Sequence, residues 1–315
     1  MRFDRKLYLI GTIVALALAG AAASMTSGPQ LASARQPTGA APTPVINISN
    51  LVGDNTSTPP QPPPPTPTSA PDFMSARALV WGDDFSAPAG TPPDPAKWNI
   101  DAGGGGWGNG EWEYYENSVG NVAQDGQGHL VMTALSPARP SGGCAYGPCN
   151  ITSARLQTDG HFAATYGRIE ARIKAPAGQG LWPAFWMLPE DDSGEIDIME
   201  NNGREPSIIS GTLHGPGFGG PAGIGAELKL FPGDTAADVF HVYSVDWTAE
   251  SIIWSVDGRP FQTIRKGDPR VGAWVFNRPY YLLLNLAVGS EDPGYPDGST
   301  SFPAKLVIDY VRVYR

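Results

Sequence analysis

The sequence predicts an all-β fold, either a β-sandwich or a jelly roll. Strand-like runs recur with Gly, Pro, Asn and Asp between them, and no long stretch has helical periodicity. The pair Asp257-Gly258 between two such runs is typical of a hairpin turn, because both residues tolerate the positive φ of primed turns. An acidic run, residues 194–200, alternates with apolar residues at the period of a half-buried strand.

The chain divides by composition into three parts. Residues 1–23 place Arg2, Arg5 and Lys6 before an uncharged apolar run, which predicts a signal peptide or an N-terminal anchor. Residues 24–72 are rich in Pro, Ala and Thr and predict a disordered linker. Residues 73–315 are long enough for one large β domain. We therefore expect a secreted or cell-envelope protein, with a membrane tether if the first segment is retained.

Charge and cysteine usage limit the partners of this domain. Residues 73–315 hold 17 Lys and Arg against 28 Asp and Glu, a net charge of −11. This acidity argues against binding to nucleic acid or anionic membranes and is compatible with a neutral substrate. We expect the protein to be a monomer. Cys144 and Cys149 lie in one short Gly-Pro loop, which in an exported protein favours a local disulfide over two reduced thiols.

Seven further runs are expected to form strands. In residues 168–174 the alternation predicts charged side chains facing outward and apolar side chains facing inward. The other runs are residues 129–134, 208–214, 241–247, 251–256, 281–288 and 306–314.

The acidic run is the strongest candidate for chemistry. Glu195 and Asp197 share a strand face, whereas Glu200 has the opposite parity. A β-bulge at about residues 198–199 would return Glu200 to the acidic face. Glycoside hydrolysis uses two carboxyl groups on opposite sides of a sugar bond, so the row predicts a cleft on a curved sheet. A solvated acidic strand and a calcium site are the alternatives.

Aromatic residues surround this run. Trp182 and Trp186 are four residues apart and share a strand face, with Phe185 on the other face. Trp107 lies in a Gly-rich loop, residues 103–115. Exposed rings beside carboxylates suit a carbohydrate cleft, and the alternative is that they belong to the core. His214 ends a strand and either contacts the substrate or is structural.

With these residues in place, the domain resembles glycoside hydrolase family 16, in particular its laminarinase-type endo-β-1,3-glucanases. The resemblance implies a β-jelly roll sandwich of two antiparallel sheets with a concave substrate cleft. It also implies retaining, double-displacement hydrolysis of β-1,3-glucan. The stretches that carry it are residues 81–85, 107–109, 166–176, 181–186, 194–200, 211–217 and 308–314.

The resemblance also implies roles for the carboxylates. Glu195 resembles the nucleophile, and Glu200 resembles the general acid that later acts as base. Asp197 resembles the residue that hydrogen-bonds the nucleophile. Catalysis then needs no cofactor. A structural Ca²⁺ is common in the family, and Asp84 and Asp309 fall at matching positions.

The residues that match positions lining the family's sugar subsites are Trp182, Trp186, Asn109 and His214, and Trp107 is the further candidate. Two stretches at the cleft rim, residues 109–111 and 290–295, depart from the family pattern. They bear on the substrate more than on the reaction. The alternative functions are hydrolysis or transglycosylation of another β-linked polymer such as a galactan, and glucan binding without catalysis.

Overall fold

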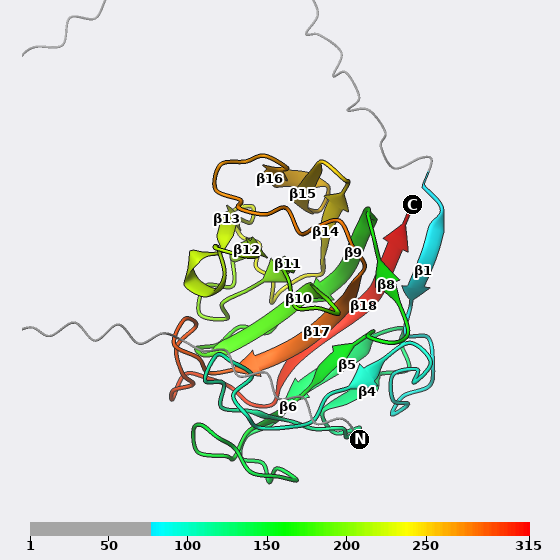
Figure 1. Ribbon diagram of the computed structural model, residues 1–315. Coiled ribbons are helices and arrows are strands. Elements are labelled where there is room, and N and C mark those ends of the chain that lie inside the picture. The colour runs from blue at the N-terminus through cyan, green and yellow to red at the C-terminus, as the bar shows by residue number, and fades with distance from the viewer. Residues whose placement is uncertain (1–76) are drawn as a thin grey trace, which may run out of the picture. The chain divides into compact units, whose positions relative to one another are not determined.

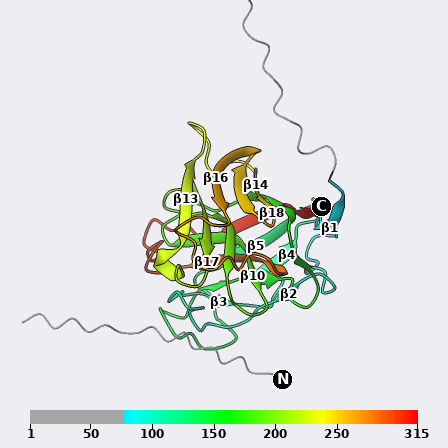
Figure 2. The ribbon, with the colours of Figure 1, turned by 45° about the horizontal axis from the view of Figure 1, so that its top comes forward.

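The computed structural model describes residues 77–315, and the signal, anchor and linker predictions for residues 1–72 lie outside this part. Two large antiparallel sheets form stacked layers (Figures 1 and 2). Among the described residues the helical structure is one 3₁₀ turn, Gly220–Ala222. No helix in this part of the chain has the length and apolar character needed to cross a membrane. The predicted all-β sandwich is confirmed.

Each sheet contains eight strands. The first runs in the order β16 (Arg259–Arg265), β15 (Ser251–Val256), β14 (His241–Trp247), β9 (Gly167–Lys174), β18 (Ala304–Tyr314), β5 (Leu130–Ala134) and β4 (Val122–Gln124), with β1 (Leu79–Asp83) also pairing with β18.

The second runs in the order β13 (Ile224–Lys229), β12 (Ile208–His214), β11 (Glu195–Glu200), β10 (Leu181–Pro189), β17 (Tyr280–Val288), β7 (Arg155–Gln157) and β2 (Asn99–Ile100), with β8 (Ala163–Ala164) also pairing with β17. A small parallel pair joins β3 (Tyr114–Tyr115) to β6 (Thr152–Ser153).

The predicted strands are confirmed, and β12, β14 and β15 have the bounds expected from the sequence. The hairpin between β15 and β16 is also confirmed, with Asp257 at φ 51° and Gly258 at φ 74° in its turn. Cys144 and Cys149 form the predicted disulfide, with a Cα–Cα distance of 5.3 Å. These features follow from local sequence, because alternation and turn chemistry act over a few residues.

The core between the sheets holds the acidic strand β11 in place. Trp254 on β15 is fully buried, and its Nε1 donates a hydrogen bond across the sandwich to the Asp197 carbonyl oxygen at 2.8 Å. Gly211 on β12 leaves room for this ring, since a Cβ there would lie 2.4 Å from Trp254 Cδ1. The indole therefore anchors the acidic strand to the opposite sheet.

The apolar side chains of β9 face the core as predicted, but its outer face is partly covered. Arg168 and Glu170 on that face are only 7% and 4% exposed. Arg168 Nε lies 2.7 Å from Glu170 Oε2, and its NH1 lies 2.9 Å from Asp246 Oδ2 on β14. Because β9 lies between β14 and β18, neighbouring side chains cover its outer face, and the charges are accommodated as buried ion pairs.

Candidate active site

A β-bulge brings the three carboxylates to one face of the sheet. Between Asp197 and Glu200 the pairing of β11 with β12 advances by three residues on β11 and by two on β12. On the other side, Asp197 and Met199 have register partners on β10 and Ile198 has none. Ile198 and Met199 are both buried in the core. The extra residue restores Glu200 to the acidic face, as the sequence predicted.

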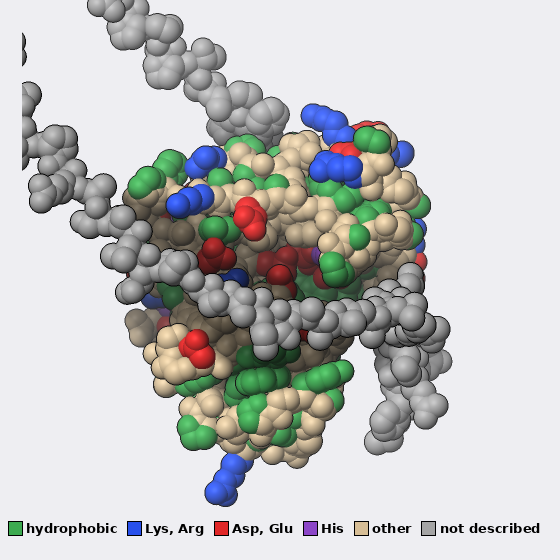
Figure 3. All heavy atoms as spheres, turned by 90° about the vertical axis from the view of Figure 1, so that its left-hand side faces the viewer, with side chains coloured by type: hydrophobic (Ala, Val, Ile, Leu, Met, Phe, Trp, Pro, Cys, Tyr) green, Lys and Arg blue, Asp and Glu red, His purple; other side chains and the backbone are tan. Residues whose placement is uncertain are grey.

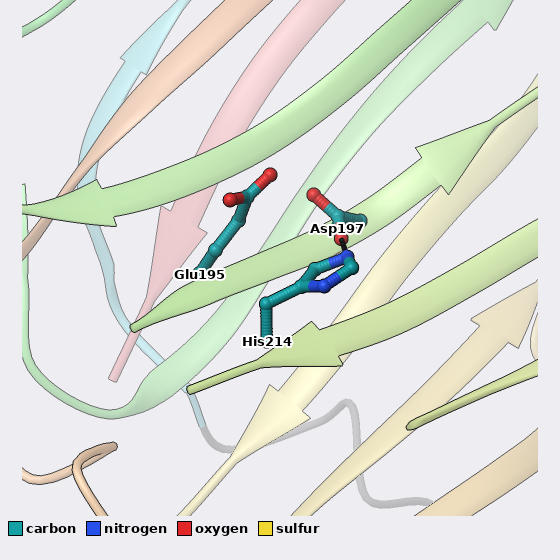
Figure 4. Close-up of side chains that lie close together, drawn as sticks. All are labelled: Glu195, Asp197 and His214. Atoms are coloured by element: carbon teal, nitrogen blue, oxygen red, sulfur yellow. Dashed lines mark ion pairs between the residues drawn. The ribbon is translucent and has the colours of Figure 1, made fainter. Parts of the chain in front are cut away.

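Asp197 is the centre of the row. It is 3% exposed, and its Oδ2 lies 3.1 Å from His214 Nε2 on the adjacent strand. Figure 4 shows Glu195, Asp197 and His214 on the same side of β11 and β12, with the imidazole beside Asp197. Glu195 and Asp197 also share a hydrogen bond. His214 therefore contacts the carboxylate row directly.

Glu200 has separate partners. Trp182 Nε1 donates a hydrogen bond to Glu200 Oε1 at 3.1 Å, and Thr212 Oγ1 lies 3.5 Å from Oε2. Thr212 is a residue that the sequence reasoning missed. Its position two residues before His214 on β12 places both side chains on the same face, which is a signal that alternation could have given.

The environment favours protonated carboxyls. Burial, with the neighbouring Asp197 charge, raises the pKa of Glu195 to about 8. Burial, with the Glu195 charge, raises the pKa of Glu200 to about 7. Burial, with the Glu200 charge, holds the pKa of Asp197 well above its usual range. At neutral pH the row therefore retains protons. Because the pKa of Glu195 is higher than that of Glu200, the form with Glu195 ionised and Glu200 protonated is a minority of the molecules.

Aromatic side chains flank the row as predicted. Trp182 and Trp186 are partly exposed on the carboxylate side of β10, while Phe185 is fully buried on the other side. Trp186 Nε1 donates to Asn285 Oδ1 on β17 at 2.7 Å. In Figure 3 acidic side chains and a histidine gather in a hollow of the surface, above hydrophobic side chains. The arrangement is a groove with carboxylates and ring faces along it.

Arg155 joins this groove to the Gly-rich loop. Its guanidinium lies over the Trp186 ring at 4.9 Å and over the Trp107 ring at 4.7 Å, and its Nε lies 3.0 Å from Asp101 Oδ2. Arg155 and Asn285 were both missed as site residues, because their roles depend on the pairing of β7 with β17.

The Gly-rich loop itself carries the remaining predicted residues. Trp107 adopts a positive φ of 48°, and Asn109 donates from Nδ2 to Glu111 Oε1 at 2.8 Å. Ser290 Oγ donates a hydrogen bond to the Asn109 carbonyl oxygen at 3.0 Å. Next to it, Trp112 stacks on Tyr295 with 4.4 Å between ring centroids. The two stretches that depart from the family pattern therefore contact each other.

Each of the two predicted metal residues pairs with an arginine. Asp84 Oδ1 lies 2.8 Å from Arg312 NH2, and Asp309 Oδ2 lies 2.6 Å from Arg172 NH1. The arginine beside each carboxylate competes with a cation for it. Among residues 77–315 the group with metal-ligand spacing is Glu195, Asp197 and His214, with ligand atoms within 4.8 Å of one another. Calcium binding stays a prediction.

Comparison with known proteins identifies relatives of this arrangement. The sequence model of Glycosyl hydrolases family 16 matches residues 111–312. The chain is 41% identical over 254 residues to a β-glucanase of Rhodothermus marinus, covering 75% of this chain and 85% of the relative. It is 36% identical to glucan endo-1,3-β-glucosidase A1 of Niallia circulans, covering 79% of this chain and 39% of that longer protein.

A solved structure is similar as well. The laminarinase catalytic domain of Thermotoga maritima superimposes with a TM-score of 0.70 at 40% identity, covering 76% of this chain and 98% of that domain.

Proposed function

This chain belongs to glycosyl hydrolase family 16, and we propose that it hydrolyses internal bonds of β-1,3-glucan by a retaining mechanism. The family makes it a glycoside hydrolase. The observation that carries the proposal is the bulged row of Glu195, Asp197 and Glu200 beside Trp182 and Trp186. The names of the relatives, a β-glucanase, a glucan endo-1,3-β-glucosidase and a laminarinase, support a β-1,3-glucan as the substrate.

The proposed reaction has two displacements. In the first, Glu200 gives its proton to the glycosidic oxygen while a Glu195 carboxylate oxygen attacks the anomeric carbon. The bond to the leaving oxygen breaks and a glycosyl ester of Glu195 forms. In the second, Glu200 takes a proton from water, whose oxygen attacks the same carbon and releases Glu195. Asp197 orients Glu195 through their shared hydrogen bond.

The same geometry suggests how sugar rings would bind. The partly exposed rings of Trp182, Trp186 and Trp107 offer flat apolar faces for pyranose rings. Asn109 is exposed on the loop beside them and is available to sugar hydroxyls. His214 is already engaged by Asp197, so its proposed role is to adjust the charge of the row.

We also propose that the protein acts outside the cytoplasm, as a monomer. The support is the basic and then apolar composition of residues 1–23 and the linker-like composition of residues 24–72. Fractionation of cells that express the full chain tests this location. Recovery of all activity from the cytoplasm would contradict export.

Proton NMR of laminarin during the first seconds of hydrolysis tests the reaction. We expect β-anomers of shortened oligosaccharides to form before mutarotation, and Glu195→Gln and Glu200→Gln to reduce turnover by at least about 10²-fold. Initial α-anomers would contradict retention. Cleavage of other β-glucans or galactans with laminarin intact would contradict the β-1,3 assignment. Binding of these polymers without any hydrolysis would indicate that the protein recognises glucan and is not an enzyme.

A further inference from the structure

A second buried carboxyl pair lies under the Gly-rich loop, apart from the catalytic row. Glu111 is 3% exposed and Glu113 is fully buried, and the two carboxyls are close enough to share a hydrogen bond when one of them is protonated. In the part of the chain that the structure describes, neither carboxyl pairs with a lysine or arginine. Two buried carboxyls without a cation cannot both be charged, so the pair holds a proton.

The surrounding donors identify the member that carries this proton. Glu111 accepts from Asn109 Nδ2 at 2.8 Å and from the Tyr115 hydroxyl at 3.0 Å, so both of its oxygens face donors. Glu113 Oε2 accepts from the Val288 amide at 2.6 Å, while its buried Oε1 receives no hydrogen bond from any described donor. A proton on Glu113 Oε1, donated to Glu111, satisfies every atom of the pair.

The electrostatics agree with this arrangement. Burial, with the Glu111 charge, holds the pKa of Glu113 well above its usual range. Burial likewise raises the pKa of Tyr115, which therefore keeps its hydroxyl proton as a donor. Arg155, whose charge acts on Tyr115, is the nearby cation, and it is paired with Asp101.

The network that ends on Glu111 begins at two side chains of the groove. One is Asn109, whose Nδ2 is committed to Glu111 and whose Oδ1 is left to accept from a ligand. The other is Trp186, which donates to Asn285 Oδ1 at 2.7 Å. Asn285 Nδ2 then donates to the Tyr115 hydroxyl at 3.2 Å, and Tyr115 donates to Glu111. Glu111 is thus the common terminal acceptor of both branches.

We propose that Glu111 is a positioning residue for substrate binding. Glu113 donates its proton to Glu111, and Glu111 in turn orients the Asn109 amide and the Trp186 ring. The identity of the ligand as a β-glucan rests on the proposed function, whereas the direction of the hydrogen bonds does not.

Because the hydrogen bond runs from Glu113 to Glu111, two isosteric variants should behave differently. In Glu113→Gln the new amide nitrogen still donates to Glu111, and its oxygen still accepts from the Val288 amide. In Glu111→Gln the new amide nitrogen replaces one of the two oxygens and faces either Asn109 Nδ2 or the Tyr115 hydroxyl, each of which donates to Glu111 in the intact network. Two buried donors that face each other cannot form a hydrogen bond, so the free-energy cost of removing them from water is not offset.

Kinetics of the full chain on laminarin test the proposal, with Glu116→Gln as the matched control. Glu116 binds the exposed turn at Ser141 and is outside the network. We expect Glu111→Gln to raise KM about tenfold with kcat within about twofold of the wild type. Glu113→Gln and Glu116→Gln should change neither constant by more than about twofold. A merely structural role would lower the melting temperature without separating KM from kcat.

The proposal is overturned if Glu113→Gln raises KM as much as Glu111→Gln, or if neither variant changes KM. A second readout needs no substrate. In ¹³C-labelled protein the Glu113 carboxyl resonance, assigned by its loss in Glu113→Gln, should stay at the protonated position at pH 7. An ionised position would overturn the donor assignment. If the wild type leaves laminarin intact, the proposed function is wrong. The Glu113 carboxyl resonance still shows in that case whether Glu113 donates to Glu111.

Discussion

The hydrogen bond from Trp182 to Glu200 makes the pH dependence of the reaction sensitive to one indole nitrogen. Trp182 Nε1 lies 3.1 Å from Glu200 Oε1, and this bond favours the ionised carboxylate and so lowers its pKa. Trp182→Phe keeps an aromatic ring and removes the donor. Without the donor, the protonated form of Glu200 persists to higher pH.

The size of this effect follows from the bond that is lost. A hydrogen bond to a charged group contributes roughly 1.5–3 kcal/mol, and one pKa unit corresponds to about 1.4 kcal/mol. Trp182 is partly exposed, so the lower end of the range applies. The pKa of Glu200, which is about 7 in the intact site, should therefore rise by about one unit.

The assay is the pH profile of kcat/KM, whose alkaline limb reports the loss of the catalytic proton from the carboxylate row. We expect the limb of Trp182→Phe to move upward, by at most about one pH unit because Glu195 titrates in the same row. Trp186→Phe is the matched control, because Trp186 Nε1 donates to the neutral Asn285 side chain. It should raise KM and leave the limb in place. An unmoved limb in Trp182→Phe, or an equal shift in the control, would refute the reasoning.

Two further predictions concern stability. Glu170→Ala leaves Arg168 buried with only Asp246 as a partner and should cost roughly 3 kcal/mol, lowering the melting temperature by about 6–12 °C in calorimetry; a change below about 2 °C would contradict it. Replacing Cys144 and Cys149 by serine opens a short loop and should cost about 2 kcal/mol, or about 4–8 °C. Dithiothreitol should lower the melting temperature of the wild type and not that of the double variant.

The placement of the carboxylate row could be predicted because it depends on local sequence. Strand periodicity assigns Glu195 and Asp197 to one face, and the opposite parity of Glu200 leaves a bulge as the way to join them. The observed register shift between Asp197 and Glu200 confirms this inference. The same short-range signals located the hairpin at Asp257 and the main strands.

Burial and long-range partners could not be predicted in this way. Alternation in residues 168–174 indicates which side chains share a face, and it does not indicate what covers that face. Asp246, which pairs with Arg168, lies 78 residues away in the sequence. The Glu111 network likewise depends on Asn285, whose bond to Tyr115 spans 170 residues. Such partners become visible only when the order of strands in each sheet is known.

The two tryptophans of β10 show why these long-range partners matter for function. Both rings are partly exposed on the carboxylate side of β10, while each indole N–H is directed to an acceptor within the protein. The acceptor of Trp182 is the ionisable Glu200, so fixing this ring also adjusts the proton on which the proposed chemistry depends. The acceptor of Trp186 is the neutral Asn285, so fixing that ring affects binding alone. Equivalent positions on one strand face therefore acquire different roles from the strands that pair beside them.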